Sequence, residues 1–197
     1  MNYLNFNTFL TSTLEIDENE ISSMIESCMV KTVKKEEFLL RKDENCKHSF
    51  FVEKGLLRQY SIDEKGKEHI LSFAPEGWIV TDRESVYFNQ PSAYVIQAME
   101  NSQVILLDEH FFQILSKKFP KFTDFNNRLL HNHIRHLKKR IKLLLSAVAK
   151  DRYLEFIKMY PDIVNRVPQT MIASYLGITP ESLSRVRKEL IRENFKH

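Results

Sequence analysis

The sequence predicts an α+β protein with an N-terminal antiparallel β-roll of jelly-roll type and flanking helices, followed by a long helix and a C-terminal helix-turn-helix. Short segments rich in Val, Ile, Phe and Tyr run from about Lys31 to Leu107, and an uninterrupted helical pattern continues from Pro120 to about Val148. Residues 169–190 then have the spacing of two helices joined by a turn. We therefore expect a roll over 1–119, a long helix over 120–148 and a helix-turn-helix over 149–197.

The segment before the strands has the apolar spacing of short helices packed on one side, at Leu14, Ile21, Met24, Ile25 and Met29. The strands themselves are expected within HSFFVEKG, LLRQYSID, HILSFAPEG, YVIQAME and SQVILLD. Between two of these segments, DEKG at Asp63–Gly66 predicts a hairpin turn, because Gly66 tolerates a positive φ. Antiparallel strands joined in this way predict a sheet closed into a barrel or roll.

The helical part of the chain begins at clear local signals. Asp108 is a candidate N-cap for EHFFQILSKKF, and Pro120 suits the first turn of the helix that follows. Along this long helix one narrow seam is apolar, at Leu130, Ile134, Leu137, Ile141, Leu144 and Val148. Two interpretations stay open: the seam packs against the protein's own sheet, or it pairs two copies of the chain as a homodimer.

Charge is distributed unevenly along the chain. Residues 1–127 contain 14 Lys and Arg against 20 Asp and Glu, a balance of −6, whereas residues 128–197 contain 15 against 6, a balance of +9. This asymmetry indicates that the C-terminal third meets a polyanion, although helices with solvated Lys and Arg would look the same.

Several classes of protein are excluded by what the sequence contains. The two cysteines, Cys28 and Cys46, are too few and too far apart for a disulfide framework, an iron-sulfur cluster or a CxxC site. We expect no metal site, since only two of the histidines His131, His133 and His136 share a helix face and no carboxylate completes the set. No catalytic motif is present, so we expect neither an enzyme nor a cofactor. The sequence also has no signal peptide or membrane span, which favours the cytoplasm and no membrane partner.

The most informative stretch is QTMIASYLGITPESLSRVRKEL, from Gln169 to Leu190. A helix-turn-helix requires a small residue, a turn residue and a branched apolar residue at its fifth, ninth and fifteenth positions, where this chain has Ala173, Gly177 and Leu183. The remaining core positions are apolar and the second helix has a cap and a first-turn proline, namely Ile172, Leu176, Ile178 and Val186, with Thr179 and Pro180.

With the apolar residues turned inward, the second helix presents a polar face made of Glu181, Ser184, Arg185 and Lys188. Arg donates two hydrogen bonds to guanine, Glu accepts from cytosine, and Ser bonds several partners, so this face is suited to the major groove of duplex DNA. Nearby Lys and Arg would contact phosphates. The alternative is an ordinary helical hairpin with a charged exposed face.

In this stretch, PESLSR at Pro180–Arg185 is similar to the E-x-x-S-R pattern of the fumarate-nitrate regulators, and the whole chain resembles the Crp/Fnr family of transcription regulators. The resemblance implies a cyclic-nucleotide-binding-like roll, dimerisation through 120–148 and a winged helix-turn-helix that reads an inverted repeat. It implies base reading by Glu181, Ser184 and Arg185, and other DNA contacts by Gln169, Thr170, Thr179, Ser182 and Lys188. RNA polymerase is a further candidate partner. Pro180 stands where the catabolite-activator branch has an arginine, so that guanine contact is missing.

The effector part of the resemblance is weaker. Gly77 and Ser92–Ala93 are preserved, but Val80–Thr81 replace a Gly-Glu pair and Pro91 replaces the arginine that holds the cyclic phosphate in the family. We therefore expect cyclic AMP to bind poorly.

Residues of the same region could instead line a pocket for another small ligand, unidentified from the sequence, or simply belong to the core; they are Trp78, Arg83, Tyr87 and Tyr94. The alternative function is a ligand-sensing module whose C-terminal helices bind protein, which the positive C-terminal third disfavours.

Overall fold

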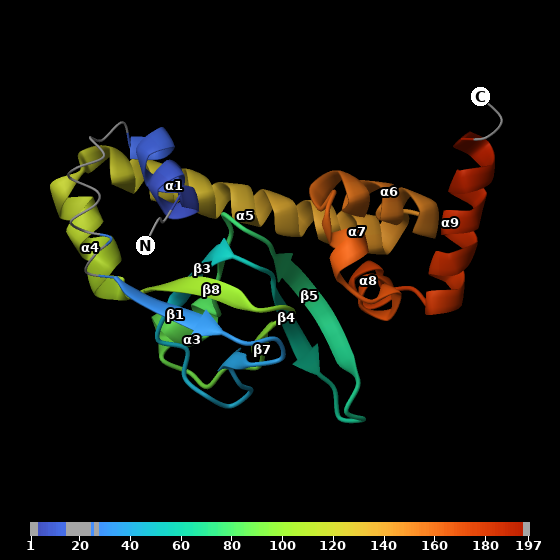
Figure 1. Cartoon of the computed structure of the whole chain (residues 1–197), viewed down its shortest axis with the longest axis horizontal. Helices are drawn as coiled ribbons and strands as arrows, with labels where there is room; N and C mark the ends of the chain where they lie inside the picture. The colour runs from blue at the N-terminus through green and yellow to red at the C-terminus, as the bar shows by residue number, and fades with distance from the viewer. Residues whose placement is uncertain (1–3, 15–24, 26–27, 195–197) are drawn as a thin grey trace.

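The computed structural model describes residues 4–14, 25 and 28–194, which form a β-roll with flanking helices, a long helix and a C-terminal group of helices (Figure 1). The strands are β1 (Met29–Val33), β2 (Phe38–Leu40), β3 (Ser49–Lys54), β4 (Leu57–Ile62), β5 (Glu68–Ala74), β6 (Ile79–Val80), β7 (Val95–Ala98) and β8 (Ser102–Leu107). The helices are α1 (Leu4–Leu14), α3 (Arg83–Phe88), α4 (Glu109–Lys118), α5 (Pro120–Ser146), α6 (Ala149–Met159), α7 (Ile163–Arg166), α8 (Gln169–Leu176) and α9 (Pro180–Asn194). The α+β class and the antiparallel roll are confirmed.

The roll consists of two four-stranded antiparallel sheets, in the orders β1-β8-β3-β6 and β2-β7-β4-β5. Their facing apolar residues form one core between the sheets, with Val52, Leu57, Ile96 and Val104 almost fully buried. The hairpin turn expected at Asp63–Gly66 is confirmed: Gly66 has φ +77° and its amide donates to the Asp63 carbonyl at 3.0 Å. The carboxylate of Asp63 also accepts from the amides of Lys65 and Lys67, which fixes the turn.

The N-terminal segment agrees only in part with the expected helices. Leu14 ends α1, and Ile25 is buried against the roll. Met29, however, begins strand β1 and pairs with Leu106, so its assignment to a helix was wrong. The conformation of Met29 is determined by its pairing with a strand far away in the sequence, and the local spacing of apolar residues does not show such a pairing. Ile21 and Met24 lie outside the described residues.

The predicted signals at the start of α4 and α5 are confirmed. The Asp108 carboxylate accepts a hydrogen bond from the Phe111 amide at 2.8 Å, and Pro120 occupies the first turn of α5. Helix α5 then runs without a break to Ser146, alongside the roll and on to the C-terminal helices (Figure 1). Only Ala147 and Val148, both in extended conformation, connect α5 to α6.

The C-terminal unit is built from helices alone in the described residues 149–194. The wing expected from the family resemblance is absent from this part of the chain. The segment between α6 and α8 forms the short helix α7 between two prolines, Pro161 and Pro168.

The C-terminal unit docks on the edge strand of the roll. Helix α8 lies against β5, where the Ser174 hydroxyl donates to the Glu68 carbonyl at 3.2 Å and accepts from the Ile70 amide at 3.1 Å. Arg140 of α5 joins both units, since its guanidinium donates to the carbonyls of Ile70 and Leu71 and, at 3.1 Å, to that of Tyr175. The exposed edge of the second sheet is therefore covered by a helix.

A second contact of the same joint is ionic. Arg166 of α7 donates two hydrogen bonds of 2.9 Å to the Glu76 carboxylate, and its guanidinium also lies 2.6 Å from Glu100. Glu76 and Glu100 belong to turns of the roll, so three charged groups hold the C-terminal unit to it. None of the described helices combines the length and apolar composition that a membrane span requires.

Candidate nucleic-acid interface

The turn between α8 and α9 has the geometry that the spacing predicts. Gly177 has φ +65°, a left-handed conformation that favours glycine, and it ends α8. The Ile178 amide then donates to the Ala173 carbonyl at 3.0 Å. Ala173 and Leu183 are almost completely buried where the two helices meet, because a larger residue at 173 would keep them apart.

The start of α9 is fixed by a side-chain cap. The Thr179 hydroxyl accepts from the Ser182 amide at 3.2 Å and donates to the Ser182 hydroxyl at 3.1 Å. The expected capping role of Thr179 is confirmed. Both hydroxyls have an intramolecular partner, and their contacts with DNA stay a prediction.

The outer face of α9 carries the residues expected to read bases. Glu181, Ser184, Arg185 and Lys188 are all exposed, whereas Leu183 and Val186 of the same helix are buried. The pKa of Glu181 lies below its usual range, because its own backbone amide, the Thr179 hydroxyl and the Arg185 charge favour the carboxylate. At neutral pH this face therefore presents the Glu181 carboxylate, a hydrogen-bond acceptor, together with the positively charged Arg185, a donor.

The first helix of the motif contributes Gln169 and Thr170. Thr170 is exposed at the first turn of α8. Gln169 is half-buried, and its Oε1 atom accepts no hydrogen bond from the described residues. Their phosphate contacts remain a prediction.

Sequence reasoning missed the residues that anchor α9 to the rest of the unit. The Lys150 ammonium of α6 lies 3.0 Å from Glu189 and 2.6 Å from Glu193. These two acids on the last turns of α9 are thereby directed away from the outer face. Lys150 is 39 residues from Glu189 and 43 from Glu193 in the sequence, so no local pattern indicates these two ion pairs.

In the roll, the start of α3 is capped by the protein's own carboxylate. Asp82 is buried and accepts from the amides of Glu84 and Ser85, and its second oxygen accepts from the Ser92 hydroxyl at 2.6 Å. A helix start and this serine are the groups that the family resemblance assigns to a cyclic phosphate. Here both already have an anionic partner.

The four residues proposed as an effector pocket are not brought together. Arg83 stacks on the ring of Tyr87, which is exposed, and Tyr94 is half-buried beside Ser92. Trp78 instead packs on Tyr160 of the C-terminal unit, with ring centroids 5.4 Å apart. Of the four, Trp78 alone lines the cavity between β5, α5, α6 and α8.

Comparisons with known proteins agree with this architecture. A family model described as a cyclic nucleotide-binding domain matches residues 30–118. The anaerobic regulatory protein of Pasteurella multocida is 28% identical over 167 residues, with 79% of this chain and 60% of that relative covered. The fumarate and nitrate reduction regulatory protein of Vibrio cholerae is 26% identical over 167 residues, with 79% and 66% covered. The chain thus spans less than two thirds of the length of both relatives.

Solved structures share the fold. FixK2 from Bradyrhizobium japonicum has a TM-score of 0.73 at 18% identity, over 85% of this chain and 86% of that one. A CooA mutant from Carboxydothermus hydrogenoformans has a TM-score of 0.70 at 19% identity, over 98% and 85%. Residues 30–118 thus match a cyclic nucleotide-binding domain, and the chain is similar in sequence to anaerobic and fumarate–nitrate regulatory proteins and in fold to FixK2.

Proposed function

We propose that the chain is a sequence-specific DNA-binding transcription regulator, and not an enzyme, that acts in the cytoplasm as a homodimer on an inverted-repeat site. The observation that carries this proposal is the exposed polar face of α9 above a correctly packed α8. In this assignment Glu181, Ser184 and Arg185 read base edges in the major groove, and Lys188 contacts phosphate. RNA polymerase is the partner that such a regulator would recruit or block.

The charge of the C-terminal part supports DNA over a protein partner. Residues 128–197 carry a balance of +9, and cations near α9 would supply the sequence-independent part of the affinity. The curated relatives are named as regulatory proteins, which agrees with this function.

The exposure of the α5 seam supports pairing of two copies. Ile134, Leu137 and Ile141 are 46%, 47% and 55% exposed, so they do not pack against the chain's own sheet. A row of apolar side chains on a long helix is stabilised when a second copy covers it. In a two-fold dimer, the two α9 helices would enter successive major grooves about 34 Å apart.

The effector is proposed to be something other than cyclic AMP. Asp82 holds the donors at the start of α3, and Pro91 supplies no charge for a phosphate. A second anion at this place would be repelled by the buried carboxylate.

Selection of bound duplexes from a random pool tests the function directly. We expect enrichment of an inverted repeat with half-sites about one helical turn apart, and similarity to the fumarate-nitrate regulators suggests half-sites of the TTGA type. A pool that shows no enrichment after repeated rounds, with the protein folded and dimeric, would contradict the proposal.

A further inference from the structure

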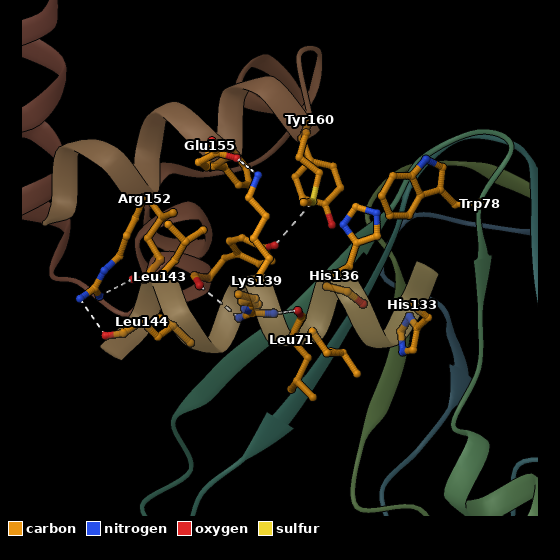
Figure 2. A pocket seen from close by; sticks show the side chains of 17 residues that line it. Leu71, Trp78, His133, His136, Lys139, Leu143, Leu144, Arg152, Glu155 and Tyr160 are labelled. Carbon is orange, nitrogen blue, oxygen red and sulfur yellow. Dashed lines mark hydrogen bonds and ion pairs between the residues drawn. The ribbon is translucent and has the colours of Figure 1, made fainter. Parts of the chain in front are cut away.

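A cavity of about 140 Å³ lies in the joint between the roll and the C-terminal unit. Its walls come from strand β5, the long helix α5, and helices α6 and α8 (Figure 2). These four elements therefore contribute to one cavity, which is partly open to solvent. Neither the family model, which ends at residue 118, nor the proposed DNA contacts account for it.

The cavity is lined mainly by aromatic and aliphatic side chains. Trp78 and Tyr160 stand with ring centroids 5.4 Å apart, and Phe156 lies 5.3 Å from both Tyr160 and Tyr175. Leu71 and Leu143 also line it. A cavity of about 150 Å³ with apolar walls is large enough for benzene, so this one suits a single ring or a similarly compact apolar group.

Most of the ionisable residues around the cavity are basic. Five basic residues line it, namely His133, His136, Lys139, Arg140 and Arg152, against one acid, Glu155. Glu155 is already paired with Lys139. Arg140 donates to three carbonyls, which use three of its five N–H groups without neutralising its charge. An anion is therefore the favoured occupant.

Two imidazoles at the cavity are available as donors. His133 and His136 make no hydrogen bond or ion pair with the residues that the structure describes. Figure 2 shows His136 projecting from α5 toward the rings of Tyr160 and Trp78. Burial, together with the charges of Arg83 and His136, lowers the pKa of His133, so this side chain offers an N–H group without needing a counter-ion.

We propose that this cavity binds a small carboxylate with one aromatic ring or an equally compact apolar body. The ring would lie among the side chains of Trp78, Phe156 and Tyr160, and the carboxylate would face His136 and the Arg140 charge. Because the roll, α5 and the C-terminal helices share the cavity, occupancy changes how firmly the C-terminal unit is docked. This regulatory consequence rests on the proposed function, whereas the binding site itself does not.

Trp78 is the single tryptophan of the chain and lines the cavity, so its fluorescence is a local probe. The full chain is titrated with benzoate and, separately, with benzyl alcohol, which keeps the ring without the charge. We expect a saturable change in emission with benzoate at millimolar concentration or below, and binding of benzyl alcohol weaker by about tenfold or more. Equal binding of the two compounds, or no saturable change with benzoate, overturns the proposal.

Three variants locate the binding. Leu143→Phe narrows the cavity and should abolish the response, and a cooperative thermal transition shows that it is folded. His136→Gln should weaken benzoate binding by about tenfold, whereas His131→Gln, on an exposed position of the same helix, should leave it unchanged. Benzoate binding that survives Leu143→Phe, or that His131→Gln weakens as much as His136→Gln does, overturns the site.

The consequence for regulation is measured with a selected duplex. Saturating benzoate should change the affinity of the wild-type chain for this duplex at least about threefold and leave that of Leu143→Phe unchanged. A chain that binds benzoate but no duplex would contradict the proposed function alone, because the fluorescence titration does not involve DNA. An unchanged DNA affinity in a chain that binds both would overturn the regulatory consequence.

Discussion

At the scale of single residues, the outer face of α9 separates two kinds of contact. Arg185 is proposed to bond a base and Lys188 a phosphate. Arg185→Ala should therefore cost roughly 1–3 kcal/mol on the selected site and little on random duplex, as measured by titration at fixed salt. Lys188→Ala should weaken both duplexes alike and reduce the salt slope by about one. Equal losses for Arg185→Ala on the two duplexes would refute its base-reading role.

Asp82 is a second residue whose role can be measured alone. Replacing it with Ala leaves two helix amides and the Ser92 hydroxyl without their acceptor, so we expect the free energy of unfolding to fall by roughly 1–3 kcal/mol in urea. Asp162 is a matched control, because it caps α7 without a side-chain hydrogen bond and is exposed. Asp162→Ala should change stability by about 0.5 kcal/mol or less, and a similar loss in both variants would contradict this account.

The same carboxylate leads to a prediction about ligands. Calorimetry with cyclic AMP should show no binding at micromolar concentration, since the donors at the start of α3 are occupied and Pro91 carries no charge. Binding in that range would show that Asp82 leaves its position when the nucleotide enters.

At the scale of elements, the α5 seam is expected to decide the oligomeric state. Ile141→Asp places a charge in the centre of the seam, where a partner helix would bury it, and should convert the dimer into a monomer in sedimentation experiments. Asn132→Asp adds the same charge on an exposed position away from the seam and should leave the dimer intact. A wild-type chain that sediments as a monomer at micromolar concentration would remove the reason for the seam.

Elements whose signals are local were predictable from the sequence. The Asp108 cap, the turn at Gly66 and the packing positions Ala173 and Gly177 all follow from the chemistry of a few neighbouring residues. Trp78 was grouped with the residues near it in the sequence, but its main partner is Tyr160, 82 positions away. The periodicity of a sequence does not indicate a contact between residues so far apart, so the sequence did not predict the cavity.

The wing is not formed by the described residues 149–194, for a related reason. The family resemblance alone predicts it, and neither the composition nor the spacing of these residues supports it. Here the local chemistry was the better guide: Pro161 and Pro168 bound a segment that forms a short helix.

At the scale of the whole molecule, the ionic contact at the joint makes docking sensitive to pH. Burial alone would raise the pKa of Glu76, but hydrogen bonds and charge from Arg166, with backbone amides including that of Gly55, hold it below its usual range. A carboxyl with a lowered folded-state pKa stabilises the fold above its unfolded pKa, about 4.5, and loses this effect as pH falls through the folded value.

At pH 7 the wild type should therefore have a higher free energy of unfolding than Arg166→Gln. This difference should shrink as the pH falls below about 4.5. Lys31→Gln removes an exposed pair with Glu37 and serves as the control, with a smaller difference at pH 7. A difference between wild type and Arg166→Gln that stays constant down to acid pH would show that the arginine acts through packing instead of charge.

The two-residue connection between α5 and α6 has a mechanical consequence. Ala147 and Val148 are extended, and two residues span at most about 7 Å, so the C-terminal unit can swing about this link but hardly travel. Arg152 holds the ends of this link together, since its guanidinium donates hydrogen bonds to the carbonyls of Leu144, Ala147 and Leu176. In a dimer, a rotation of each C-terminal unit about this link would change the distance and the angle between the two α9 helices, and with them the fit to the two half-sites.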